Sequence, residues 1–153
     1  MILYQALSSY QILECIVHRM TIHPGERAVL LLGNYIVERM PQYREARSRG
    51  FFDEVFLFRY GGYKGNEEQI LREVGEEFAR TVPYPIGDFS RIYAAGIHTF
   101  LQVLWARDHI PFAMFEDGSG ALSRPWILSD IHRKSSPRRW KLVEKYHLYD
   151  HCN

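Results

Sequence analysis

Runs of apolar residues that alternate with helix-like segments constrain the fold of this chain more than any other feature of its sequence. Residues 27–32 (RAVLLL) form a continuous apolar run, which is typical of a strand covered on both faces of a parallel sheet. Similar, shorter runs occupy residues 2–7, 54–58, 91–95 and 112–115. Five strands alternating with helices predict an α/β fold. We expect a three-layer, Rossmann-like domain with a mostly parallel sheet of about five strands and helices on both faces.

The segments between these runs carry helix signals. Ile70, Val74, Phe78 and Val82 recur at the four-residue spacing of one buried helix face. Further helices are expected after residue 34, through about residue 49, and from Gly96 through residue 105. Helix starts are predicted by capping pairs and by serines closely followed by proline: Ser8 with Gln11, Asn66 with Gln69, Ser123 with Pro125, and Ser136 with Pro137.

The length and composition of the chain limit its class. Its 153 residues suit one domain, so residues 1–153 are expected to form a single Rossmann-like unit. Nineteen basic and eighteen acidic residues give a formal charge of +1, which argues against a nucleic-acid partner. No apolar run reaches the roughly 18 residues of a membrane span, and the N-terminus lacks signal-peptide features. Cys15 and Cys152 form no disulfide framework, so we expect a reduced cytoplasmic setting with Cys15 in the core.

Ligands of open parallel sheets bind beyond the carboxyl ends of the strands. The loops expected at that edge are residues 8–11, 33–35, 60–65, 96–98 and 116–120.

The last of these loops begins with two adjacent carboxylates, Glu116 and Asp117, followed by Gly118. Strand geometry would direct the two carboxylates to opposite faces, so only one need face a cleft. A carboxylate there can take the proton of an acceptor hydroxyl that attacks an activated sugar, and general-base catalysis of this kind is worth about 100- to 10,000-fold. Taken by its spacing alone, so short a motif is more often an ordinary turn with a solvated carboxylate.

The acidic loop supplies a family resemblance. Glu116-Asp117-Gly118, continued by Ser119, resembles the acidic-acidic-glycine motif that ends a strand in the first domain of bacterial sialyltransferases and polysialyltransferases. The polar turn with Tyr10-Gln11 after the first strand is similar to the same family, as is the stretch 92–98 (IYAAGIH). The resemblance extends over most of the chain, although its one sharp motif is three residues long.

The resemblance implies a GT-B glycosyltransferase of polysaccharide biosynthesis, built from two facing Rossmann-like domains. This chain would be the N-terminal, acceptor-side half of an inverting, metal-independent enzyme, and the nucleotide-sugar-binding C-terminal half would be absent. Asp117 would be the general base, supported by Glu116. The other residues that we expect to contact substrate are Gly118, Ser119, His98, Gln11 and Ser9. No cofactor is implied, because the nucleotide-sugar donor, for which CMP-sialic acid is the candidate, is a co-substrate.

Several other features have both a functional and an ordinary explanation. His98 could bond an acceptor sugar or orient Asp117, or it could simply bond the backbone of a first helical turn. His23-Pro24 resembles the family's nucleotide-contacting pair in composition, but it precedes the acidic motif, so no role is carried over to it. The glycine-rich segment 61–65 lacks the spacing of a phosphate loop and is expected to be a flexible connection, which could contact the acceptor.

The C-terminal quarter of the chain contains two further candidates. The metal-ligand types His147, Asp150, His151 and Cys152 gather there without the paired spacings of a zinc site, and the chain has no Asp-x-Asp triad, so we expect no required metal. Six cations between residues 133 and 145 are expected to form a solvated helix face opposite Trp140. That face could also contact an anionic glycan or the inner face of the cell membrane.

Two functions therefore stay open. One is the acceptor-side half of a glycosyltransferase, whose partners would be a glycan acceptor and, through the missing domain, a nucleotide sugar. The alternative is a truncated, non-catalytic module that binds a glycan or a protein. Hydrolysis is weaker still, because glycosidases set their carboxylates about 5 to 9 Å apart across the bond, unlike neighbours on one strand. A half-enzyme could expose the apolar wall that its missing domain would cover, so homodimerisation is also expected.

Overall fold

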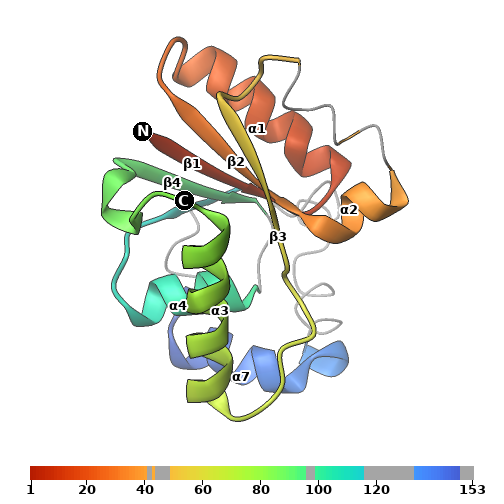
Figure 1. The fold of residues 1–153 in the computed structure, drawn as a ribbon. Coiled ribbons are helices and arrows are strands. Elements are labelled where there is room, and N and C mark those ends of the chain that lie inside the picture. Colours follow the sequence, from red (N-terminus) through yellow and green to blue (C-terminus); the bar gives the residue numbers. More distant parts are fainter. Residues whose placement is uncertain (41–42, 44–48, 96–98, 116–132, 149–153) are drawn as a thin grey trace.

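The structure, a computed structural model, describes residues 1–40, 43, 49–95, 99–115 and 133–148 (Figure 1). Its centre is one five-stranded parallel sheet with the strand order β3-β2-β1-β4-β5. The α/β, Rossmann-like fold expected from the sequence is confirmed. The strands are β1 (Ile2–Ala6), β2 (Ala28–Gly33), β3 (Glu54–Phe58), β4 (Arg91–Ala95) and β5 (Ala113–Phe115).

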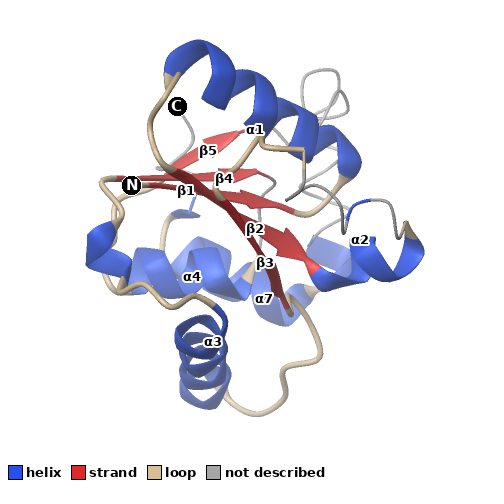
Figure 2. Ribbon diagram, turned by 45° about the horizontal axis from the view of Figure 1, so that its top comes forward, coloured by secondary structure: helices blue, strands red, loops and turns tan. Residues whose placement is uncertain are grey.

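Helices cover both faces of the sheet, which gives the three layers visible in Figure 2. Helices α1 and α2 lie on one face, and α3, α4 and α7 lie on the other. The helices are α1 (Ser9–Ile22), α2 (Asn34–Arg39), α3 (Glu67–Thr81), α4 (Phe100–Arg107) and α7 (Pro137–Lys145).

The two cores follow from the alternation of side chains along the strands. On β1, Ile2, Tyr4 and Ala6 point to the core beneath α1 and α2, and Leu3 points to the core beneath α3 and α4. Every residue of β1 and β2 is buried, because these central strands have a neighbour on each side and helices on both faces. The near-continuous apolar runs of the sequence are the consequence.

Helix α2 is shorter than the sequence analysis predicts. It ends at Arg39 instead of continuing to residue 49, and Met40 closes it with a non-helical backbone (φ −137°, ψ 79°). The physical reason is Pro41, since a proline ring disfavours helical backbone in the residue before it.

The start of α4 also differs from the prediction. The helix begins at Phe100 with Thr99 as its N-cap, not at Gly96. Thr99 and Gln102 form a reciprocal capping box, in which each side chain accepts a bond from the other residue's backbone N–H. His98 therefore precedes the helix instead of lying in its first turn. Its own placement is outside the described residues.

The caps predicted for α3 and α7 are confirmed in position. Asn66 and Gln69 form a capping box, and α3 buries Ile70, Val74 and Phe78 with Val82 at its end. Ser136 is the N-cap of α7 and Pro137 its first residue, although the Ser136 side chain makes no capping bond. The pair Ser123 and Pro125 lies outside the described residues.

Candidate functional site

The strand order reverses between β1 and β4, and this reversal defines the candidate site. The chain leaves β1 toward β2 on one side and leaves β4 toward β5 on the other. The two connections therefore diverge at the carboxyl edge of the sheet, where doubly wound folds bind their ligands. The N-termini of α1 and α4 follow these two strands directly. Each brings the positive end of a helix dipole to that edge.

The turn between β1 and α1 is held by local hydrogen bonds. Ser8 is the N-cap, and its Oγ accepts a bond from the Gln11 backbone N–H at 3.3 Å. Gln11 Oε1 accepts from the Leu7 N–H at 2.7 Å, one residue before the position that a capping box requires. The Tyr35 hydroxyl at the start of α2 donates to the Leu7 carbonyl oxygen. The turn is thereby fixed to α2, and Gln11, which is 3% exposed, is committed to the turn's structure.

Three hydrogen-bonded polar side chains are buried between β1 and the start of α4. Gln5 Nε2 donates to Thr99 Oγ1 at 3.2 Å, and the same hydroxyl accepts from the Gln102 N–H at 3.2 Å. Gln5 and Gln102 are fully buried, and Thr99 nearly so. This Gln5–Thr99–Gln102 group joins the central strand to the start of α4. The sequence analysis missed it, although the three-residue spacing of Thr99 and Gln102 is a capping-box signal.

Replacing Thr99 by valine should lower the free energy of unfolding by about 1–3 kcal/mol. Valine preserves the side-chain shape but removes the acceptor that serves two buried N–H donors. Urea unfolding followed by circular dichroism measures the change. Thr21→Val is the matched control, because the Thr21 hydroxyl is exposed and bonds only within α1, so its effect should stay within about 0.5 kcal/mol. Equal effects of the two substitutions would contradict a special role for the Thr99 hydroxyl.

Residues 59–65 form the loop after β3, next to this edge. Tyr60 and Tyr63 are buried, and their hydroxyls donate to the backbone carbonyls of Leu31 and Arg59. Burial holds the pKa of the Tyr60 hydroxyl well above its usual range, so this group stays protonated. Gly62 and Gly65 have positive φ, which explains the glycines. An acceptor contact of this loop stays a prediction.

The residues of the acidic loop lie outside the described part of the chain. These are Glu116, Asp117, Gly118 and Ser119, together with His98. Strand β5 ends at Phe115, and the sequence continues directly with Glu116. Of the substrate-contact candidates, the structure describes Gln11, which is buried in the α1 turn, and Ser9, which is exposed in the first turn of α1 at the same edge. Their roles in substrate binding stay predictions.

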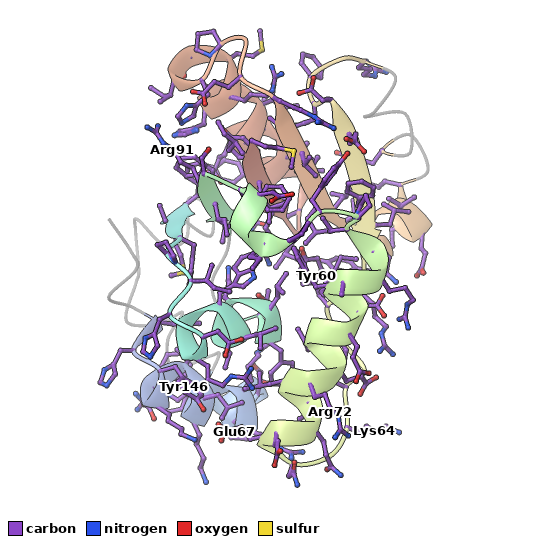
Figure 3. All side chains as sticks on the ribbon, turned by 60° about the vertical axis from the view of Figure 1, so that its left-hand side comes forward. Tyr60, Lys64, Glu67, Arg72, Arg91 and Tyr146 are labelled. Atoms are coloured by element: carbon purple, nitrogen blue, oxygen red, sulfur yellow. The ribbon has the colours of Figure 1, made fainter. Side chains whose placement is uncertain are left out.

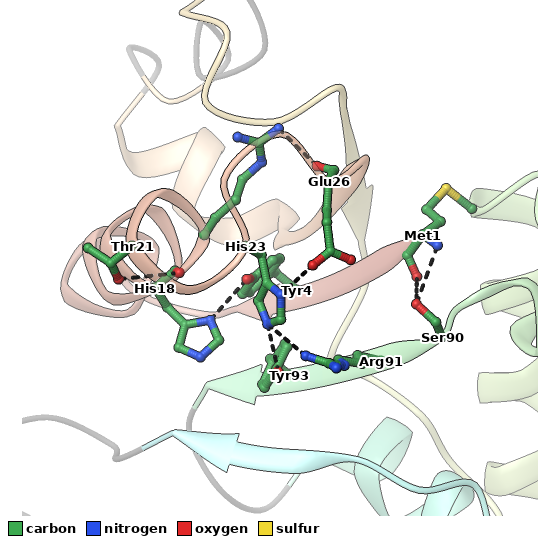
Figure 4. A network of polar contacts seen from close by, with 10 residues as sticks. Met1, Tyr4, His18, Thr21, His23, Glu26, Ser90, Arg91 and Tyr93 are labelled. Carbon is green, nitrogen blue, oxygen red and sulfur yellow. Dashed lines mark hydrogen bonds and ion pairs between the residues drawn. The ribbon is translucent and has the colours of Figure 1, made fainter.

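A second polar network lies between the C-terminal end of α1 and β4, on the α1 face of the sheet (Figure 4). His23, which is 1% exposed, bonds Glu26 Oε1 through Nδ1 at 2.7 Å and the Tyr93 hydroxyl through Nε2 at 2.9 Å. A carboxylate only accepts, so Nδ1 is the donor to Glu26. The Tyr4 hydroxyl meets His18 Nδ1 at 3.0 Å. His23-Pro24 thus closes α1 and ties it to β4, which is a structural role.

His18 makes stability depend on pH. Burial and the neighbouring His23 lower the pKa of His18, so the unfolded chain binds this proton more readily than the folded one. Stability should therefore be complete above the unfolded pKa of about 6.5 and fall as the pH drops through that value toward the lower folded pKa. Urea midpoints between about pH 7 and pH 5 measure this loss. His18→Gln should flatten the dependence, and an unchanged slope would contradict it.

Helix α7 is amphipathic as the sequence predicts, except that Arg139, one of the expected solvated cations, is half-buried. Trp140 and Val143 are buried, and Arg138, Lys141 and Lys145 are exposed. The cations are not all free, because Lys145 Nζ and the Tyr146 hydroxyl both bond the Glu67 carboxylate at the start of α3 (Figure 3). The interaction anchors α7 to α3. A contact of this face with a membrane surface or an anionic glycan stays a prediction.

The described residues include no group of three or more histidine, cysteine or acidic side chains that could hold a metal ion. His147 is exposed at the end of α7, and Asp150, His151 and Cys152 lie outside the described residues. Cys15 is a buried free thiol, as expected. In the described part of the chain, every helix is too short or too polar to cross a bilayer.

Comparison with known proteins identifies no relative. No family model matches the sequence, no curated protein matches it, and no solved structure matches the fold closely enough to count. The fold and the site alone place the chain in a class: it is a Rossmann-like α/β domain with a candidate ligand site at the reversal between β1 and β4.

Proposed function

We propose that this chain is the acceptor-side domain of an inverting, metal-independent glycosyltransferase of the sialyltransferase type. It would move sialic acid from CMP-sialic acid to a glycan acceptor, with Asp117 as general base. The observation that carries the proposal is the strand reversal between β1 and β4, combined with the sequence position of Asp117 two residues after the end of β5, the strand paired to β4.

The chemistry of the described residues at this edge supports a sugar ligand. Ser8, which is half-buried, and Ser9, which is exposed, are uncharged and carry hydroxyl groups, the partners that sugar hydroxyls need. The N-termini of α1 and α4 favour an anionic group, such as the carboxylate of a sialylated acceptor, over a cation. A site with this character selects polar, hydroxylated ligands with little positive charge.

The proposal assigns the acceptor and the nucleotide sugar to two different domains, because this chain has the size of one domain. One Rossmann-like sheet provides one wall of a GT-B cleft, and a nucleotide sugar would be held by a second domain opposite it. The roles of the acidic loop would be proton removal by Asp117, support from Glu116, and a close backbone approach at Gly118. As the acceptor oxygen attacks, the bond between the anomeric carbon and the CMP phosphate would break, and the second domain would stabilise the departing CMP.

Acceptor binding and transfer test the proposal separately. Titration of sialylated and neutral oligosaccharides into the isotopically labelled chain should shift amide resonances around Ser8, Ser9 and Thr99. Transfer is then assayed with CMP-sialic acid and a panel of other nucleotide sugars, using this chain alone and joined to any sequence that continues its reading frame. Binding without turnover in either form would favour the non-catalytic glycan-binding module. Neither binding nor turnover would contradict both.

A further inference from the structure

The exposed residues of α1 carry no charge, and its one acidic residue, Glu14, is half-buried beside them. Its exposed residues are Ser9, Tyr10, Leu13, Val17, Met20, Thr21 and Ile22. The large aliphatic side chains among them are more than half exposed: Ile22 is 59% exposed at the end of the helix, and Leu13, Val17 and Met20 are 58%, 52% and 55% exposed. Their spacing of four and three residues places them in one line along the helix, continued by Tyr10 at 46%. We call Tyr10, Leu13, Val17 and Met20 the α1 stripe.

The other long helix, α3, shows what a solvated face of this protein looks like. Its exposed residues are Glu68, Gln69, Arg72, Glu76, Ala79 and Arg80. Ion pairs such as Arg72 with Glu76 run along that face. Helices α1 and α3 pack against opposite faces of the same sheet, and they differ in the side chains that they direct to solvent. The largest exposed apolar patch of a domain is often functional.

We propose that the α1 stripe is the interface of a symmetric homodimer, in which the α1 helices of two copies pack antiparallel. A two-fold axis near the middle of the stripe sets Leu13 of one copy opposite Val17 of the other, and Tyr10 opposite Met20. Such an isologous contact requires a surface that is complementary to itself, and dimers of this kind are the commonest oligomers. An uncharged apolar line meets that requirement, because no like charges come together and none is buried.

The basic residues of α1 lie beside the stripe and already serve their own copy. Arg19 Nη2 bonds Asp53 Oδ2 at 3.3 Å and the Glu26 carbonyl oxygen at 3.3 Å. His18 bonds Tyr4. Dimerisation therefore leaves these interactions in place. The stripe also offers a charged partner nothing to pair with, which favours a second copy over an acidic or basic protein.

A lipid surface fits α1 less well than a second copy does. Interfacial helices combine an apolar face with lysines and arginines that contact anionic headgroups. Arg19 is the one basic residue of α1 apart from His18, and it is held by Asp53. Helix α1 thus lacks the cations that such binding uses.

The size of the stripe predicts a weak dimer. Four half-exposed side chains present on the order of 300 Å² per copy, the size of the largest patch on an ordinary monomer. Two copies with their flanking atoms would bury somewhat under about 1,200 Å², the range of transient complexes. The dissociation constant should therefore lie in the micromolar to millimolar range, where association depends visibly on concentration.

Sedimentation equilibrium between about 10 µM and 1 mM tests this proposal. The wild-type chain should shift from monomer to dimer across that range. Leu13→Glu and Val17→Lys should each weaken the dimer at least about 10-fold, because each places a charge in an apolar contact. Both positions are exposed, so thermal melting should confirm that each variant folds. Leu57→Glu is the matched control: Leu57 is 45% exposed on β3 at the edge of the sheet, and its replacement should leave dimerisation unchanged.

Mixing the two charged variants tests the antiparallel geometry. Leu13→Glu and Val17→Lys should form a mixed dimer more tightly than either forms with itself, because the introduced carboxylate of one copy would meet the introduced ammonium group of the other. A monomeric wild type at all concentrations would overturn the proposal. So would a dimer that survives Leu13→Glu, or one whose variants show no mutual rescue. Flotation with anionic vesicles that depends on Leu13 would assign the stripe to a membrane instead.

Discussion

Replacing Asp117 by asparagine should lower the rate of sialyl transfer by about 100- to 10,000-fold in the form of the chain that carries out transfer. Asparagine keeps the size and shape of the side chain but cannot accept a proton from the acceptor hydroxyl. The loss should fall on kcat, since the substitution removes a group that acts in the transition state and leaves ground-state contacts largely in place. Initial rates with saturating CMP-sialic acid and acceptor measure it.

Two comparisons make the Asp117 result specific. Glu116→Gln should reduce the rate less, because we assign Glu116 a supporting role and strand alternation directs it to the other face. Asp108→Asn should leave the rate unchanged, because Asp108 closes α4 at the end away from the candidate site and is paired with Arg107. Equal rates for wild type and Asp117→Asn would remove Asp117 from the mechanism while leaving glycan binding open.

Replacing Trp105 by alanine should lower the free energy of unfolding by about 3–5 kcal/mol. Trp105 is 1% exposed and is the largest of the fully buried side chains among the residues that the structure describes. Its ring contacts Phe78 of α3 edge-on, at a centroid distance of 6.3 Å, and Phe112 before β5 at 5.6 Å. The substitution leaves a cavity where α3, α4 and the sheet meet. Such a loss is a large fraction of the total stability of a domain of this size.

Denaturant unfolding of Trp105→Ala measures this loss by tyrosine fluorescence and circular dichroism, and coincident transitions would justify a two-state analysis. Leu57→Ala is the control, because Leu57 is 45% exposed and its truncation should cost under about 1 kcal/mol. A Trp105→Ala loss as small as that of Leu57→Ala would mean that the core around α4 relaxes to fill the space.

The strands were the most predictable part of the fold. The bounds predicted for β3 and β4, 54–58 and 91–95, agree with the structure, and the other three strands differ at their ends by one residue. Buried central strands leave a strong apolar signal because both faces must be covered. The order in which strands pair leaves no comparable signal, and the reversal between β1 and β4 came from the structure alone.

The predicted helix boundaries were wrong where a proline or a capping residue determines them. The apolar and polar pattern after residue 33 continues past the true end of α2, and Pro41 stops the helix regardless of that pattern. Gly96 suggested an early start for α4, whereas Thr99 supplies the side-chain oxygen that a helix start needs. The proline in the first case and the capping hydroxyl in the second outweighed hydrophobic periodicity.

The position of the candidate site could be predicted from the sequence, but only some of its residues could. The loop 8–11 was expected at the carboxyl edge of the sheet, and it lies there. The amide oxygen of Gln11 nonetheless accepts a hydrogen bond from the Leu7 N–H, because a turn that leads into a helix must satisfy its backbone donors. The Gln5–Thr99–Gln102 group went unnoticed because it unites residues about a hundred positions apart. Such contacts follow only from the pairing of β1 with β4.

The central position of β1 in the sheet has a consequence for folding during synthesis. Residues 2–6 leave the ribosome before the rest of this domain, yet β1 pairs with β4, which is synthesised about ninety residues later. At about 5–20 residues per second, the buried first strand waits several seconds for that neighbour. Until then β1 can pair only with β2, and its other edge stays open to wrong partners. A lower expression temperature, which weakens apolar association, and a soluble N-terminal fusion should therefore improve the yield of folded protein.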